Sequence, residues 1–125
     1  MPDVSIEEEV ELPPPRARVI LSIMAAASDE QLRFAIAEKR LIQFTYLGAL
    51  RVAEPHDYGV YQGVTRLLAY QLRGSSSRAT SARGWKLLDV AKIIGCTVLN
   101  ETFAGSRGEA HQRHYVWDVL YARVD

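Results

Sequence analysis

Residues 28–46 read SDEQLRFAIAEKRLIQFTY, and within this stretch the spacing of apolar residues changes from about 3.6 to 2. Ser28 and Gln31 form a capping-box pattern, which predicts a helix that starts here and runs to about Arg40. Apolar and polar residues then alternate over 42–46, as is typical of a half-buried strand. The stretch therefore predicts one helix followed directly by a strand.

Turn-forming residues divide the rest of the chain into short pieces with a strand-like composition. We expect strands at 51–54 (stopped by Pro55), 57–62, 64–72, 85–90 and 97–99, with Gly48, Gly63 and Gly95 in the turns. Residues 115–124 are apolar enough to form either a strand or a short helix. One helix followed by closely spaced short strands predicts a mainly β chain of the α+β class, closed into a small β-barrel.

The sequence predicts one folded domain with a segment on each side. Residues 1–27 form an acidic, proline-rich arm and a short apolar segment, residues 28–103 form the helix and barrel, and residues 104–125 form a loop and an apolar element packed on the barrel. No apolar run approaches the roughly 18 residues of a membrane-spanning helix. Because Cys96 is the single cysteine, we expect no intrachain disulfide and a cytoplasmic location.

Charge is unevenly distributed along the chain, although the net charge is zero. Five of the 15 acidic residues lie within the first 15 positions, which contain no basic residue, so residues 16–125 hold 15 basic and 10 acidic residues. Most of the basic residues are arginines, whose planar guanidinium suits phosphate and carboxylate. This asymmetry indicates either an anionic partner or a solvated, arginine-rich surface.

The order of these pieces resembles the WYL domain, a bacterial ligand-sensing module. The matching motifs are Ala35-Ile36 with Lys39-Arg40, the strand ending at Tyr46, Arg51 ahead of Glu54-Pro55, the Ala69-Tyr70 pair and the stretch from Leu88 to Ile93. The resemblance covers roughly residues 30–100 and implies an Sm-like or SH3-like β-barrel. It also implies binding of a nucleotide-like or single-stranded nucleic-acid anion, with a role in transcription regulation.

The chain departs from this family at several positions. The name-giving Trp-Tyr-Leu falls on Arg66-Leu67-Leu68, and the expected Phe-Arg pair falls on Leu88-Asp89. Family members usually carry a DNA-binding winged helix-turn-helix, for which we find no room here. Regulation would then require a separate DNA-binding partner protein or would act through the ligand.

Six residues are candidates for contacts with an anionic ligand. Arg51 lies at the family's basic ligand contact, but it could instead pair with Glu54 or Asp57. Arg66 is either in the site or at an exposed strand end, and Lys92 occupies the family's second arginine position. The remaining candidates are Lys86, His56 as a donor to phosphate or a turn residue, and Tyr70 (like Tyr46) as a base-stacking ring or a core residue.

No pattern supports catalysis, a metal or a cofactor. His111 and His114 are spaced as i and i+3, but no carboxylate or cysteine nearby completes a ligand set. The serines at 75, 76, 77 and 81 lack a nucleophile-elbow motif. We therefore expect a binding module rather than an enzyme. The alternative is a protein-interaction or homo-oligomerisation module that uses the apolar flanks 19–27 and 115–124.

Overall fold

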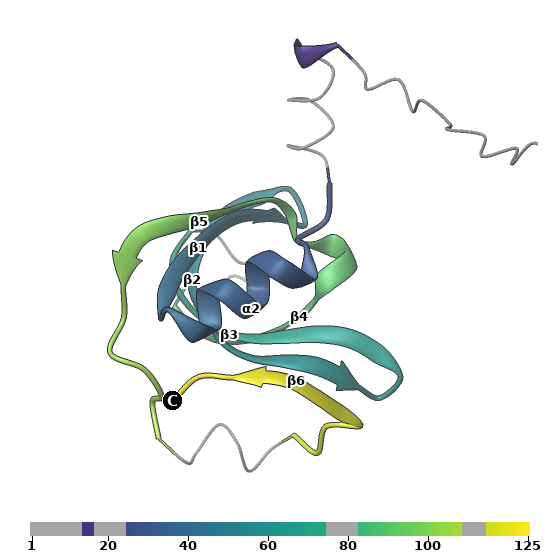
Figure 1. Cartoon of the computed structure of the whole chain (residues 1–125), viewed down its shortest axis with the longest axis vertical. Coiled ribbons are helices and arrows are strands. Elements are labelled where there is room, and N and C mark those ends of the chain that lie inside the picture. The colour runs from purple at the N-terminus through teal and green to yellow at the C-terminus, as the bar shows by residue number, and fades with distance from the viewer. Residues whose placement is uncertain (1–13, 17–24, 75–82, 109–114) are drawn as a thin grey trace, which may run out of the picture.

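The computed structural model describes residues 14–16, 25–74, 83–108 and 115–125 (Figure 1). Its elements are helix α2 (Asp29–Ala37), strands β1 (Arg40–Tyr46), β2 (Ala49–Tyr61), β3 (Val64–Gly74) and β4 (Gly84–Asp89), the 3-10 helix η1 (Val90–Lys92), and strands β5 (Ile94–Thr102) and β6 (Val119–Arg123). The described part is mainly β with one short helix ahead of the sheet, as predicted. The acidic arm at 1–13, the apolar residues 19–24, the serine-rich loop 75–82, His111 and His114 lie outside the described residues.

Helix α2 begins where the sequence predicts it. The Ser28 hydroxyl accepts from the Gln31 backbone N–H at 3.1 Å, and the Gln31 side chain accepts from the Ser28 N–H at 3.1 Å, so the capping box is complete. The helix ends at Ala37 rather than near Arg40, because Lys39 adopts a positive φ of 52° that stops the helix. No helix in the described ranges is long and apolar enough to cross a membrane.

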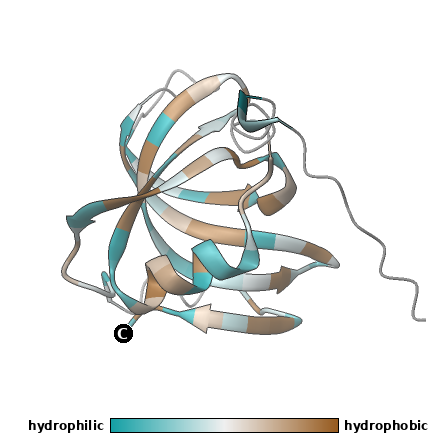
Figure 2. Cartoon of the chain, turned by 45° about the horizontal axis from the view of Figure 1, so that its top comes forward, coloured by the Kyte–Doolittle hydropathy of each residue, from teal (hydrophilic) through white to brown (hydrophobic). Residues whose placement is uncertain are grey.

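All six strands pair antiparallel in one sheet. The strand order is β4-β3-β2-β1-β5, and β6 pairs with β2 beside the end of β1. The sheet is strongly curved, as Figure 2 shows, but it is not closed into a barrel. Among the described residues, β4 and β5 form the two ends of the order and do not pair with each other. The prediction that the sheet closes into a barrel is therefore wrong.

Strand β2 runs through Pro55, where the sequence predicted that a strand would stop. Its first part pairs with β1 up to Ala53, and its last part pairs with β6 from Asp57 onward, while β3 accompanies both parts. Pro55 lies between these two regions, beside a register shift, so its missing N–H removes no hydrogen bond to either strand. The two predicted pieces 51–54 and 57–62 are thus one long, bent strand.

Two further points concern the C-terminal part of the chain: the position of Gly95 differs from the prediction, and the structure shows which of the two predicted forms the C-terminal stretch adopts. Gly95 lies inside β5 rather than in a turn before it. The apolar C-terminal stretch forms a strand, β6, and not a helix. Gly59 makes its pairing possible, because a Cβ at this position of β2 would lie 2.1 Å from the Val119 carbonyl oxygen.

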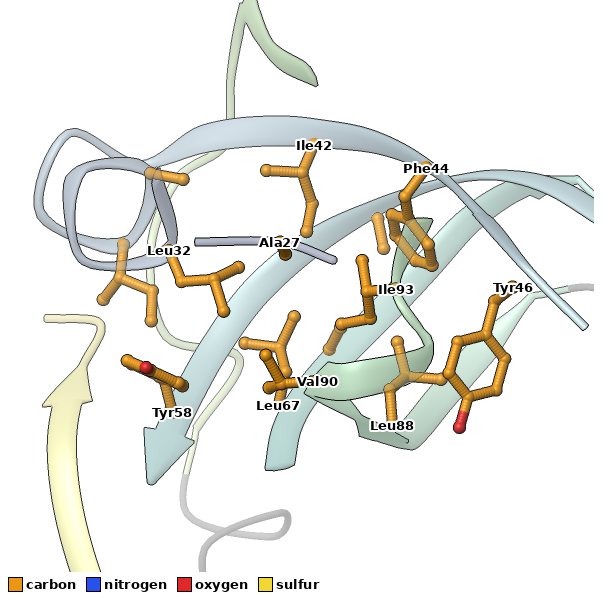
Figure 3. Close-up of a cluster of buried hydrophobic side chains, with 14 of the residues drawn as sticks. Ala27, Leu32, Ile42, Phe44, Tyr46, Tyr58, Leu67, Leu88, Val90 and Ile93 are labelled. Atoms are coloured by element: carbon orange, nitrogen blue, oxygen red, sulfur yellow. The ribbon is translucent and has the colours of Figure 1, made fainter. Parts of the chain in front are cut away.

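The core lies between α2 and the inner face of the curved sheet. Figure 3 shows this cluster, with Tyr58 at one end and Tyr46 beside Leu88 at the other. Leu32 from α2, Ile42 from β1 and other apolar side chains fill the space between the two tyrosines. Alternation along β1 therefore defines the inner face as the one that carries Ile42, Phe44 and Tyr46.

Candidate anion-binding site

Arg51 lies on the inner face of the sheet, among apolar side chains. It is directly opposite Phe44 in the β1–β2 register, and residues opposite each other in an antiparallel pair project to the same side. Only 3% of Arg51 is exposed. The residue that the sequence proposed as the first ligand contact is thus a buried arginine beside the core.

The Arg51 guanidinium is held by neutral groups. Nη1 donates to Gln71 Oε1 at 3.3 Å, and Nη2 donates to the Tyr46 carbonyl oxygen at 3.2 Å. The guanidinium carbon lies 5.2 Å from the centre of the Tyr46 ring. Nε is buried without a hydrogen-bond partner. Burial lowers the pKa of Arg51, but an arginine stays protonated in proteins, so a positive charge is buried here.

No carboxylate of the described residues pairs with this buried charge. The acidic groups that form ion pairs in the described ranges are held by other basic residues. The salt bridges from Arg51 to Glu54 or Asp57, which the sequence allowed as an alternative, are absent, because these two carboxylates face the other side of the sheet and bind Arg107 and Arg123. A buried charge without a counter-ion is costly.

Two polar side chains share the inner face with Arg51. Gln71 lies opposite Ala53, and Lys86 lies opposite Ala69 on the neighbouring strand. Both have the same strand parity as the buried leucines Leu67 and Leu88. The structure therefore brings Arg51 and Lys86, both predicted, to one face, together with Gln71. Sequence reasoning missed Gln71, although its even spacing from Leu67 along β3 was a usable signal.

Tyr46 fixes one side of this site. Its ring contacts the Arg51 guanidinium, its carbonyl oxygen accepts from Arg51, and its hydroxyl oxygen accepts from the Asp89 N–H at 3.1 Å at the far end of β4. The ring is thus bound at both ends and almost fully buried. It orients Arg51 and leaves no open face for a stacked base.

Arg66 and Lys92 do not join Arg51. Arg66 lies opposite Asp89 with the parity of Leu68, on the outer face of the sheet, and its Nη1 is 3.5 Å from Asp89 Oδ1. Lys92 Nζ is 3.5 Å from Asp89 Oδ2, and the Lys92 side chain is largely exposed. The predicted cleft lined by Arg51, Arg66 and Lys92 is therefore not formed, because strand alternation places Arg66 on the opposite side from Arg51.

His56 and Tyr70 belong to a second cluster on the outer face. His56 is fully buried, with Nε2 3.0 Å from Glu54 Oε1 and its ring 4.8 Å from that of Trp85. The Arg107 guanidinium carbon lies 3.8 Å from the centre of the Tyr70 ring. His56 is therefore too buried to donate to a ligand from solvent, and Arg107 occupies one face of the Tyr70 ring.

Glu54 is the centre of this second cluster. Arg107 donates to its two oxygens at 2.7 and 2.9 Å. Burial alone would raise the pKa of Glu54, but the hydrogen bonds from Arg107 and His56 outweigh it, so the pKa lies below its ordinary value. Arg123 makes a similar two-point contact with the buried Asp57, at 3.0 and 3.2 Å. The buried carboxylates Glu54 and Asp57 are thus each paired with an arginine.

Three other features of the described residues were considered as sites: clusters of metal ligands, the Cys96 thiol and two surface hollows. No group of three His, Cys, Asp or Glu in this part of the chain could hold a metal ion. Burial raises the pKa of the Cys96 thiol to about 11, so it stays protonated at neutral pH. Two hollows of about 330 and 270 Å³ lie beside Gln31, and none of the predicted site residues lines them.

The fold and the site together define a small α+β protein whose open antiparallel sheet buries an uncompensated arginine on its inner face. Comparisons of the chain with protein-family models, curated proteins and solved structures find no match. The resemblance to WYL domains therefore stays a prediction.

Proposed function

We propose that this chain is a ligand-binding module, not an enzyme, and that Arg51 recognises the anionic group of its ligand. The observation that carries this proposal is the buried guanidinium whose acceptors are an amide and a backbone carbonyl, with Nε unpartnered. Hydrogen bonds from arginine to phosphate or carboxylate are roughly twice as strong as those to neutral acceptors. An anion would compensate a charge that the described residues leave uncompensated.

The contact between Arg51 and Gln71 indicates how the ligand would enter. Gln71 Oε1 accepts from Nη1 at 3.3 Å and belongs to a side chain that can change rotamer, whereas the Tyr46 carbonyl group is fixed in the backbone. An incoming anion would displace Gln71 Oε1 from Nη1 and bind the guanidinium in its place. Lys86 lies on the same face of the sheet. Because Arg51 is buried, binding would require local opening and would be slow.

The resemblance to WYL domains suggests which class of ligand, which role and which partner this module would have. The order of one helix and five strands, with η1 between β4 and β5, is compatible with the Sm-like architecture expected of a WYL-like domain. A nucleotide-like or single-stranded nucleic-acid ligand, a role in bacterial regulation and a DNA-binding partner protein remain proposals that depend on this resemblance.

Titration calorimetry with inorganic phosphate, a nucleoside monophosphate and a short oligothymidylate tests the anion site. We expect at least one of them to bind at low salt and Arg51→Gln to weaken that binding by at least tenfold, because the charged donor is lost. Arg66→Gln is the matched control, since Arg66 is a partly buried strand arginine that pairs with Asp89 on the other face. Absence of binding to all three probes, or equal binding by Arg51→Gln, would refute the proposal.

A second candidate function is self-association through β6. The exposed apolar residues on and beside this strand include Val116, which is 86% exposed, and Val119, Leu120 and Tyr121. Apolar surface of this kind often marks a protein contact. We expect light scattering to show an oligomer that Val116→Glu combined with Val119→Glu dissociates, whereas Thr97→Glu on β5 leaves it intact. A monomeric wild-type protein would exclude this function.

A further inference from the structure

The turn between β1 and β2 carries an unusual residue. Leu47 and Gly48 form a two-residue hairpin loop with φ values of 51° and 78°. Positive φ at both positions is the pattern of a type I′ turn, which favours Asn, Asp or Gly at its first position. A leucine in this left-handed region is disfavoured because its Cβ approaches the following carbonyl group.

Packing within the described chain does not explain this leucine. Leu47 is 61% exposed, and Leu50, at the start of β2, is 59% exposed. The loop between β2 and β3 has the same backbone conformation, with φ values of 50° at Gln62 and 77° at Gly63, and it carries a polar residue at the corresponding position. An apolar side chain held in a disfavoured conformation and exposed to water points to a contact beyond the described residues, and we take a ligand as that contact.

The turn is joined directly to the buried arginine. The carbonyl oxygen that accepts from Arg51 Nη2 at 3.2 Å is that of Tyr46, and this carbonyl group belongs to the peptide bond that leads into Leu47. The charged group and the exposed leucine therefore lie on either side of a single peptide unit. Among the exposed apolar residues in the described ranges, Leu47 is the one whose own backbone N–H belongs to the peptide group that accepts from Arg51.

We infer that the ligand is an amphipathic anion, whose phosphate or carboxylate binds Arg51 and whose aliphatic part packs against Leu47. This inference rests on the proposed function of the Arg51 site. In the described part of the chain, the aromatic ring in contact with Arg51 is that of Tyr46, which is buried and offers no open face to a nucleobase. Leu47 instead offers the kind of surface that an alkyl chain covers.

Parallel titrations with inorganic phosphate and monomeric octyl phosphate test the inference. We expect the wild-type protein to bind octyl phosphate at least about tenfold more tightly than phosphate, since covering two methylene groups is worth roughly that factor. In Leu47→Asn this advantage should shrink to less than about threefold, because the apolar surface is lost. The affinity for inorganic phosphate should stay unchanged, and the melting temperature should stay the same or rise, because Asn suits the turn.

Gln62→Asn is the matched control. It introduces the same residue at the equivalent position of the β2–β3 loop, where no apolar side chain is removed, and should alter neither ligand affinity. If wild type binds phosphate and octyl phosphate equally, or if Leu47→Asn leaves the octyl advantage intact, the inference is overturned while the anion site stands. If neither compound binds, the inference is overturned, and the anion site is overturned with it when the nucleoside monophosphate and the oligothymidylate also fail to bind. If Leu47→Asn instead dissociates an oligomer without changing binding, the leucine is a subunit contact and the inference is overturned.

Discussion

At the scale of single residues, Arg51 and Glu54 show two ways of burying charge in one strand. Glu54 lies on the outer face and is neutralised by the two-point contact with Arg107 and by His56. Arg51 lies on the inner face and has only an amide and a carbonyl oxygen as acceptors. The first arrangement stabilises the native state relative to a broken pair, whereas the second carries an uncompensated desolvation cost.

This difference predicts opposite effects of removing two arginines. We expect Arg51→Met to leave the free energy of unfolding unchanged or to raise it by up to about 2 kcal/mol, because an apolar side chain replaces an uncompensated charge. Arg123→Met should lower it by about 3 kcal/mol, because the buried Asp57 loses its partner. Urea denaturation of both variants measures the two effects. A comparable loss in both would mean that Arg51 is structural and would argue against a ligand role.

The sequence predicted which residues of one strand share a face, because strand alternation is a local property. It correctly grouped Arg66 with Leu68 and Tyr70, since residues two apart share a face. It could not decide which face Arg51 takes relative to Arg66, because that depends on how β1, β2 and β3 are paired, including the register shift beside Ala53. Arg51 and Arg66 were therefore assigned to one cleft, although they lie on opposite sides of the sheet.

At the scale of elements, α2 connects two strands that are not neighbours in the sheet. Gln31 Nε2 donates to the Cys96 carbonyl oxygen of β5 at 3.0 Å, and Arg33 Nη1 donates to the Tyr121 carbonyl oxygen of β6 at 3.2 Å. The start of α2 could be predicted, because a capping box involves four consecutive residues. The length of β2 could not, because strand continuation through Pro55 depends on which partners flank it.

The contact of β6 with β2 depends on the close approach at Gly59. We expect Gly59→Ala to lower the free energy of unfolding by about 2 kcal/mol, because the new Cβ would overlap the Val119 carbonyl oxygen. Hydrogen exchange should become faster at the β6 amides in particular. Val60→Ala, one residue further along β2, removes side-chain packing without obstructing the backbone. Unchanged exchange in β6 of Gly59→Ala would contradict the proposed role of this glycine.

At the scale of the whole molecule, the two faces of the sheet are covered in different ways. Helix α2 covers the inner face, as Figure 1 shows, whereas Arg107 and Arg123 fix parts of the C-terminal region to Glu54 and Asp57 on the outer face. The order of helix and strands follows from local patterns and was predicted. Closure of the sheet was predicted wrongly, and the roles of Arg107 and Arg123 were not predicted, because both depend on contacts between residues far apart in the chain.

The pairing of β2 with three strands has a consequence for the order in which the molecule folds. Strands β1, β2 and β3 are joined by two-residue loops, so their pairing closes short loops and costs little chain entropy. By contrast, β5 reaches β1, and β6 reaches β2, only after long intervening segments. We therefore expect the β1–β2–β3 meander to form first and β6 to join it late. The C-terminal end of β2 would then be the last part of that strand to be enclosed.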